Sequence, residues 1–570
     1  MNALFVAVLA VACFLLAYAF YGRFLGRRIL SLDRTRQTPA HELRDDIDYV
    51  PSRKSVLFGH HFASIAGLGP ILGPAIAVIW GWLPALIWIV VGSIFLGAVH
   101  DFTTLVVSIR HKGRSIGSIA ETLIGPRART LFLLLIFFVL SLAMGVFALV
   151  IAILFSREMY PESVIPVFSL MFIAVAVGYL VTKRGVPLVP AAIVGFIVMT
   201  STLWLGVRFP VVGPSQSTWV VILLIYAFIA SVLPVWLLLQ PRDFLNSFQL
   251  IIGMVITYVG LALLRPMIVA PPINRAPQDL PALFPFLFIT VACGAISGFH
   301  NLVSSGTTAK QLNSESDARF IGYGSMLVEG ALGVIVLLAC VAGMGSAAQW
   351  HEHYVSWQAA GSLNQQLHAF VQGAGRFAAE LGIPHEIGVT FISVIIVGFA
   401  MTTLDSATRL LRYNIQEMGQ EFRIPPFRNR YFASLIAVAA IGYFALLRIG
   451  PRPAGLILWQ LFGTTNQLLA GLGLLAVTIY LYKSRRPTVF TTIPMLFMLA
   501  TTGTAMVIKI GEFWSQKAWA PLVVGVILLV LAIWLAVEAF AVWRRTSASR
   551  RVLEPEKGRT SERHSKPLGP

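Results

Sequence analysis

The sequence predicts an all-α polytopic membrane protein with about 15 transmembrane helices. Of its 570 residues, 57% are hydrophobic and only 12% are charged, and the mean hydropathy is +0.79. Apolar stretches of about 20 residues recur along the chain, and this length is needed to cross a bilayer. A single water-soluble core could not hide so many apolar side chains.

The expected spans follow one another from the first residues almost to the C-terminus, separated by charged or polar segments. The first stretch lacks a basic leader region and a small-residue cleavage site, so we expect a retained span and no signal peptide. The expected spans are residues 3–22, 57–79, 84–108, 130–154, 163–182, 187–206, 218–239, 247–264, 283–304, 322–345, 387–408, 431–447, 456–481, 490–509 and 520–542.

The net charge of +18 reflects membrane topology and does not indicate nucleic-acid binding. With the N-terminus outside, about 34 of the 43 Lys and Arg residues fall in inside segments and about 9 outside, as the positive-inside rule describes. Anionic lipid headgroups of the cytoplasmic leaflet reinforce this bias. An odd number of spans then places the basic tail in the cytoplasm.

Neither a cofactor nor a metal site is expected, and no catalytic residues are assigned. The three cysteines (Cys13, Cys293 and Cys340) all lie in expected spans without metal or redox spacing. The sequence contains no Walker A loop, no dinucleotide-binding glycine pattern and no HExxH motif. We therefore expect a protein that is not an enzyme and does not use ATP within this chain.

The second span contains the run FGHHFASIAGLGPILGP, from Phe58 to Pro74. Gly and Pro interrupt helical hydrogen bonding, and the freed backbone groups cannot stay unpaired in hydrocarbon. Irregular backbone at this depth must therefore face protein or a watery cavity. In transporters, interrupted helices of this kind hold substrate and coupling ions.

The seventh span contains SVLPVWLLLQPRDF, with Pro234 in its interior. Successive spans alternate in direction, so two blocks of five spans are inverted relative to each other, as in an inverted five-plus-five repeat transporter core. We expect non-helical backbone near Ala66–Pro74 and Leu233–Trp236, close together at mid-membrane. The expected organisation is a first span (1–22), a cytoplasmic loop (23–56), a transporter core (57–408, with repeats at 57–206 and 218–408 and an outside loop at 346–386), additional spans (431–542) and a disordered basic cytoplasmic tail (543–570).

Ionisable residues inside spans are costly and are therefore functional candidates. The imidazoles of His60 and His61 can accept protons near physiological pH. Asp101 in the third span needs a cation or a proton as a partner. We expect His60, His61, Asp101 and His300 to converge on one cavity, although a histidine bonded to a backbone carbonyl is the plainer alternative.

Further polar residues lie in the ninth and eleventh spans. The stretch CGAISGFHNLVSSGTTAKQL places hydroxyl, amide and imidazole groups between glycines, at a break where they suit either Na⁺ or a polar substrate. Ser and Thr also bond back to their own helix. Asp405 precedes Arg409 by four residues, a spacing that predicts an ion pair with a structural or gating role. Glu329, Asn466 and Gln467 have no assignable role.

These motifs resemble the carbon starvation protein A (CstA) family of bacterial inner-membrane transporters. The similar stretches include DYVPSRKSVLFGHHFASIAGLGPILGP, VHDF, SVLPVWLLLQPRDF, LFPFLFITVACGAISGFHNLVSSGTT, TTLDSATR and WQLFGTTNQLLAG, spread over residues 48–473. The resemblance implies uptake of peptides or proton-coupled uptake of pyruvate, and a core like that of amino acid–polyamine–organocation transporters. The chain departs from the family in its shorter segment between the tenth and eleventh spans and in His100, where Gln is expected.

From the residues and the resemblance together, we expect a cation-coupled importer of short peptides in the bacterial inner membrane, with H⁺ favoured over Na⁺. A proton-coupled symporter of pyruvate or another small carboxylate is the alternative, and a nutrient sensor or channel is an alternative of another class. The oligomeric state stays open. The candidate residues are His60, His61, Ser64, Gly67, Gly69, Pro234, Trp236, Ser297, His300 and Asn301 for substrate; Asp101, Ser304, Ser305, Thr307 and Thr308 for ion coupling; and Asp405 and Arg409 for gating.

Overall fold

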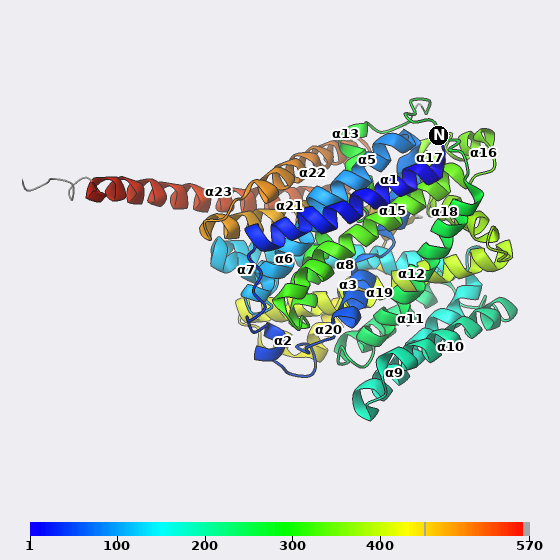
Figure 1. Cartoon of the computed structure of the whole chain (residues 1–570), viewed down its shortest axis with the longest axis horizontal. Coiled ribbons are helices and arrows are strands. Elements are labelled where there is room, and N and C mark those ends of the chain that lie inside the picture. Colours follow the sequence, from blue (N-terminus) through cyan, green and yellow to red (C-terminus); the bar gives the residue numbers. More distant parts are fainter. Residues whose placement is uncertain (278, 450–451, 562–570) are drawn as a thin grey trace, which may run out of the picture.

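The protein is a bundle of long apolar helices, seen in a computed structural model that describes residues 1–277, 279–449 and 452–561 (Figure 1). Among these residues, eleven helices are long and apolar enough to cross a membrane, and one bent pair makes twelve. Three expected spans remain. Two are occupied by shorter apolar helices, and the third is occupied by two short helices with non-helical backbone between them. The all-α membrane fold is confirmed, whereas the exact number of spans stays a prediction.

The helices of the first half occupy the eight expected spans, with two additional short helices. The helices are α1 (Ala3–Leu16), α2 (Pro39–Glu42), α3 (Lys54–Ile65), α4 (Gly69–Ala77), α5 (Trp82–Gly92), α6 (Ala98–Arg110), α7 (Ile116–Leu123), α8 (Pro126–Leu154), α9 (Val164–Arg184), α10 (Leu188–Arg208), α11 (Gln216–Val232) and α12 (Leu239–Leu264).

The second half contains seven expected spans and a helical outside segment, with one two-stranded hairpin among its described residues. The elements are α13 (Leu283–Thr290), α14 (Gly298–Gly306), α15 (Gly324–Ala342), α16 (Ala347–His353), α17 (Trp357–Ala360), α18 (Leu363–Ala379), α19 (His385–Glu421), α20 (Arg430–Leu446), β1 (Arg448–Ile449), β2 (Arg452–Pro453), α21 (Ala454–Lys483), α22 (Val489–Ser515) and α23 (Trp519–Ser561).

Burial separates central helices from peripheral ones. Of the 18 most apolar consecutive residues, 83% are buried inside the bundle in α8 and 89% in the span that ends with α15. In α10 the share is 22%. Phe172 on α9 and Trp204 on α10 are 77% and 68% exposed, as suits side chains that face lipid. The N-terminus lies at the same end of the bundle as α16 and α17, and α2 lies at the other end (Figure 1).

The interruption of the second span is present but shorter than predicted. Helix α3 ends at Ile65, and α4 begins at Gly69 with a bend of 48° between them. The segment expected to be irregular up to Pro74 is therefore helical from Gly69. Pro70 lies in the first turn of α4, where a missing N–H costs no helical hydrogen bond, so helix can resume before it.

The non-helical backbone predicted near Leu233–Trp236 is present, but its interpretation as a break within one span is wrong. Leu233 to Leu238 is the connection between α11 and α12, so Pro234 does not break a single helix. There the Val235 N–H donates to the Ile47 carbonyl, and Trp236 Nε1 donates to the Asp46 carbonyl. Pro234 and Trp236 therefore lie against the segment expected to be the cytoplasmic loop.

The second interrupted span is the ninth, formed by α13 and α14 with non-helical backbone between Thr290 and Gly298. Asn466 on α21 stabilises this break, because its Oδ1 accepts the Phe299 N–H at 2.8 Å and its Nδ2 donates to Ser297 Oγ at 2.9 Å. The extents of the two repeats, 57–206 and 218–408, stay predictions.

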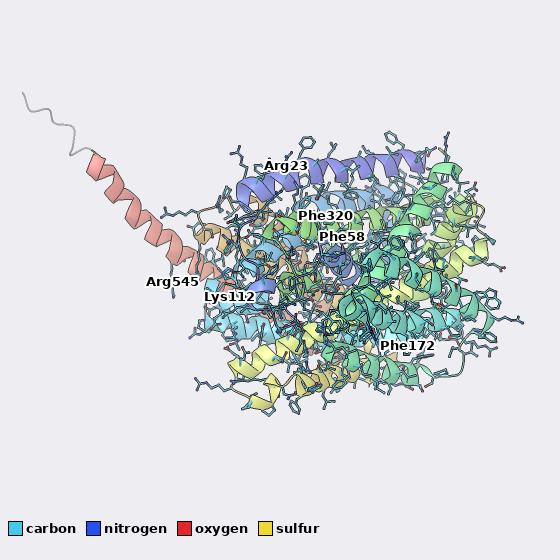
Figure 2. All side chains as sticks on the ribbon, turned by 60° about the horizontal axis from the view of Figure 1, so that its bottom comes forward. Arg23, Phe58, Lys112, Phe172, Phe320 and Arg545 are labelled. Carbon is cyan, nitrogen blue, oxygen red and sulfur yellow. The ribbon has the colours of Figure 1, made fainter. Side chains whose placement is uncertain are left out.

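The segment after residue 542 also differs from the expectation of disorder. Helix α23 continues to Ser561 and extends away from the bundle, with Arg545 near the point where it leaves (Figure 2). Ala, Arg and Glu have high helix propensity, which favours continuation of the preceding span. Residues 562–570 of the predicted tail lie outside the described residues.

Candidate functional site

The two interrupted spans meet at their breaks. A small cavity of about 20 Å³ lies between them, enough for about one water molecule. Gly67 and Gly69 line it from the first break, and Cys293 and Phe299 line it from the second. A Cβ atom on Gly67 would lie 2.5 Å from Thr403 Oγ1, so only glycine allows the first break to approach α19 this closely.

Asp101 and His300 form one buried polar network beside these breaks. Asp101 on α6 accepts from His300 Nδ1 at 2.9 Å and from His100 Nδ1 at 2.8 Å. Glu329 on α15 lies 3.5 Å from His300 Nε2. The side chains of all four residues are fully buried, and we call them the Asp101 network.

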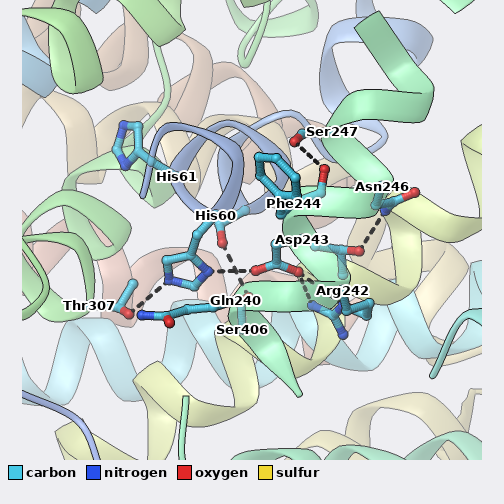
Figure 3. A network of polar contacts seen from close by, with 12 residues as sticks. His60, His61, Gln240, Arg242, Asp243, Phe244, Asn246, Ser247, Thr307 and Ser406 are labelled. Atoms are coloured by element: carbon cyan, nitrogen blue, oxygen red, sulfur yellow. Dashed lines mark hydrogen bonds and ion pairs between the residues drawn. The ribbon is translucent and has the colours of Figure 1, made fainter. Parts of the chain in front are cut away.

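His60 belongs to a second network. Its Nδ1 lies 2.6 Å from Asp243 Oδ2, and its Nε2 lies 3.1 Å from Thr307 Oγ1 and from Gln311 Nε2. Figure 3 shows that His61 points away from His60, and its Nδ1 instead bonds to Thr308 Oγ1 at 2.8 Å. The adjacent histidines therefore contact different partners, and neither forms a hydrogen bond with Asp101.

Arg242 extends the network of His60. Its guanidinium donates to Asp243, forms an ion pair with Asp405 and donates to the Tyr226 hydroxyl at 2.8 Å. The Tyr226 hydroxyl donates to Asp405 at 2.5 Å. We call His60, Tyr226, Arg242, Asp243 and Asp405 the Arg242 network.

The predicted ion pair between Asp405 and Arg409 is wrong. Arg409 instead lies 2.8 Å from Asp48 in the expected cytoplasmic loop, and Arg412 lies 3.1 Å from the same carboxylate. Burial raises the pKa of Asp48, but the positive charges of Arg412, Arg409 and Lys310 lower it overall, well below its usual value. The i, i+4 spacing placed the two residues on one face of α19, but each has a closer partner on another element.

The remaining candidates are dispersed. Ser64 Oγ lies 3.3 Å from Ser406 Oγ, and Ser305 Oγ bonds back to the Asn301 carbonyl at 2.8 Å. The Asn301 amide atoms and Ser304 Oγ are buried without a hydrogen-bond partner. Thr307 and Thr308 contact the two histidines, so the ninth-span hydroxyls face several partners.

Several residues of these sites were not selected from the sequence. Thr403 and Phe299 line the cavity, Asn466 holds the second break, and Arg242 with Asp243 completes the charged network. Arg242 and Asp243 belong to the sequence QPRDF. Two charged residues directly next to a predicted span could have been recognised as candidates. Asn466 was recognised as a polar intrusion in its span.

Comparisons with known proteins agree with the sequence resemblance. The family model described as carbon starvation protein CstA matches residues 2–350 and 345–505. A peptide transporter CstA from Campylobacter jejuni is 35% identical over 88% of this chain and 79% of its own length. Two Escherichia coli K12 proteins are also similar: a peptide transporter CstA (34%, covering 91% of this chain and 82% of that protein) and the pyruvate/proton symporter BtsT (32%, covering 89% and 82%).

Among solved structures, a manganese transporter from Eremococcus coleocola aligns with 88% of this chain and 99% of its own at 12% identity. Its TM-score of 0.42 is too low to support an inference. The family model and the relatives, in contrast, cover most of the chain. The protein is a multi-pass bacterial inner-membrane transporter that belongs to the carbon starvation protein CstA family.

Proposed function

We propose that this protein is a secondary active importer, and not an enzyme, that takes up short peptides together with protons. The observation that carries the proposal is the meeting of two interrupted spans at their breaks, next to a buried carboxylate–imidazole network. Interrupted helices give a transporter a site whose two halves can move separately. Buried groups that titrate supply a means of coupling that movement to a proton gradient.

Peptides and pyruvate share a carboxylate, which the positive ends of α4 and α14 favour electrostatically. Both half-helices begin at the breaks, at Gly69 and Gly298. The cavity between them holds about one water molecule in this conformation, so uptake requires it to widen, and its apolar lining groups such as Met144 and Phe147 would then suit an aliphatic part of the substrate. Peptide uptake is favoured because most of the similar relatives are named peptide transporters.

Pyruvate is the second candidate substrate. The Escherichia coli pyruvate/proton symporter is 32% identical to this chain, a value within the range of the peptide transporters. Proton coupling suits both candidates. We assign proton carriage to Asp101 because it joins two imidazoles, His100 and His300, in a buried environment.

The test is uptake into proteoliposomes that contain only this protein. Radiolabelled dialanine and radiolabelled pyruvate are supplied separately, first with an inward pH gradient and no Na⁺, then with an inward Na⁺ gradient and no pH gradient. We expect accumulation of dialanine in the first condition. Accumulation of pyruvate alone would establish the second substrate, and accumulation only with Na⁺ would refute proton coupling.

A further inference from the structure

We infer that Glu329, on α15, is the residue that exchanges the coupled proton with Asp101, and that His300 carries the proton between them. This inference rests on the proposed proton-coupled uptake. It adds the group that donates the proton, the group that carries it, and the helix whose movement controls the transfer. The geometry places His300 between two carboxylates, with Nδ1 2.9 Å from Asp101 Oδ2 and Nε2 3.5 Å from Glu329 Oε2.

Glu329 has an unusual environment for a carboxylate. Its side chain is fully buried, and neither of its oxygens has a hydrogen-bond partner. An ionised carboxylate without donors is very costly in a low-dielectric interior, whereas the neutral acid is much less so. In this conformation Glu329 is therefore suited to hold a proton.

Charge balance in the Asp101 network also depends on protons. Its members are two carboxylates (Asp101 and Glu329) and two imidazoles (His100 and His300). Among the described residues, neither carboxylate forms an ion pair with Lys or Arg. Because the described residues supply no fixed cation, the network approaches neutrality only by binding protons, and each proton that leaves changes its charge.

The titratable groups in and around the Asp101 network come from three further elements besides α15. His300 and Cys293 belong to the second interrupted span, and one atom of each lies with a Glu329 oxygen within 4.8 Å. Asp101 and its partner His100 belong to α6. His61 on α3 lies within electrostatic range of Asp101 and His300, and its Nε2 is buried without a partner.

A proton can pass along this row through a transient imidazolium, and the imidazole is neutral again at the end of the transfer. The O–H bond of Glu329 breaks as an N–H bond forms at His300 Nε2. The Nδ1–H bond of His300 then breaks, and its proton binds Asp101 Oδ2. Glu329 ends as the carboxylate, Asp101 ends as the acid, and His300 ends neutral with its proton on the other nitrogen.

The position of His300 links this transfer to a movement of the backbone. His300 lies in the first turn of α14, directly after the non-helical segment that separates α13 from α14. Glu329 belongs to the continuous helix α15, and Asp101 belongs to the continuous helix α6. A tilt of α14 at its break therefore changes the 3.5 Å separation between His300 and Glu329, so that transfer depends on conformation.

The test compares Glu329→Gln with Ser325→Ala in proteoliposomes. Gln keeps the size of Glu but cannot titrate. Ser325 lies one turn earlier on α15, is equally buried and also has no partner for its hydroxyl, so it is a matched control. Two rates are measured with whichever of radiolabelled dialanine and pyruvate the wild-type protein accumulates: uptake driven by an inward pH gradient, and exchange against unlabelled substrate without a gradient.

We expect Glu329→Gln to lower pH-driven uptake by about a hundredfold, the contribution of a positioned proton donor, while exchange stays near the wild-type rate. Ser325→Ala should retain both. Equal loss of uptake and exchange in folded Glu329→Gln would overturn the inference, as would wild-type uptake that requires a divalent cation and disappears with a chelator.

The outcomes separate the inference from the proposed function. If Asp101→Asn loses pH-driven uptake and Glu329→Gln does not, proton coupling stands and the role of Glu329 is refuted. If the wild-type protein shows no pH-driven uptake, the proposed coupling itself fails. Should Glu329→Gln not fold, Glu329→Asp replaces it, because the shorter side chain widens the gap to His300; an unchanged pH-driven rate would then overturn the inference.

Discussion

The charged residues of the Arg242 network and of the Asp101 network are all buried, yet their charges are balanced in different ways. Arg242 contacts Asp243 and Asp405 directly, and a guanidinium does not lose its proton in proteins. The Asp101 network contains carboxylates and imidazoles but, among the described residues, no such fixed cation. The first network can therefore hold helices together at any working pH, and the second can change its charge.

The comparison gives the two networks separate roles. The Arg242 network joins α11, α12, α19 and α3 through side chains that bond to one another, as Figure 3 shows for His60, Asp243 and Arg242. We propose that it acts as a gate, with Asp405 paired to Arg242. The Asp101 network joins the second interrupted span, through His300, to the helices α6 and α15, and we propose that it carries the proton.

The largest expected effect comes from removing the fixed cation. Arg242→Gln leaves the carboxylates of Asp243 and Asp405 buried without a cation, and breaking a buried pair costs about 3–5 kcal/mol. We expect loss of folded protein, measured by size-exclusion chromatography in detergent. Arg208→Gln on an exposed position of α10 is the control. A normal yield of stable Arg242→Gln protein would show that the network is dispensable for folding.

Asp48 offers a fixed ion pair outside the membrane and a pH test. Asp48→Asn leaves Arg409 and Arg412, each 1% exposed, without their shared carboxylate, and should lower stability by about 1–3 kcal/mol. The folded pKa of Asp48 is depressed, so its contribution is complete above the unfolded value of about 3.9 and is lost as pH falls toward the folded value.

Thermal unfolding in detergent at pH 7 and at lower pH measures this dependence. We expect the difference between wild type and Asp48→Asn to be constant near neutrality and to shrink only below about pH 4. Asp46→Asn, in an exposed pair with Arg44, should change little at either pH. A difference that grew on acidification would contradict the assigned pairing.

The close approach of the first break to α19 is tested by adding a methyl group at Gly67. Gly67→Ala places a methyl group 2.5 Å from Thr403 Oγ1, and overpacking of this kind costs about 1–3 kcal/mol. We expect weakened uptake and a lower unfolding temperature, both partly restored by Thr403→Ala. Gly503→Ala, where nothing lies within 4 Å, is the control. Failure of Thr403→Ala to restore either property would show that the close approach is not the cause.

The two histidines should differ in stability more than in uptake. His60→Ala removes the 2.6 Å partner of Asp243 and should cost about 1–3 kcal/mol. His61→Ala removes one bond to a threonine, so we expect a folded protein with strongly weakened uptake. Uptake and unfolding temperature are measured for both variants. Normal uptake in both would mean that the histidines are structural.

The sequence was sufficient to locate most of the apolar helices, because apolar length is a local property that each segment carries by itself. It also identified the first break, where Gly and Pro adjoin His60 and His61. The second break was misplaced because Pro234 was interpreted as an interruption, although a proline equally suits the start of the turn between two helices. In the ninth span, the glycines around Ser297 were recognised as part of a polar break, but this break was not paired with the first one.

Contacts between residues that are far apart in the chain could not be predicted from the sequence. Asp405 was paired with Arg409 because a sequence shows only neighbours on one helix, whereas Arg242 and Asp48 come from distant segments. Glu329 had no role for the same reason, since its relation to His300 exists only after α14 and α15 pack together. Asp101 and His300 were both selected, because a buried charge is conspicuous even without its partner.

The central claim is that one network carries the proton and the other does not. The most direct test measures pH-driven accumulation and gradient-free exchange in the same proteoliposomes for Asp101→Asn and Asp405→Asn. The account predicts that Asp101→Asn loses accumulation but retains exchange, whereas Asp405→Asn lowers both in parallel. Full accumulation by Asp101→Asn, or selective loss of accumulation by Asp405→Asn, would contradict it.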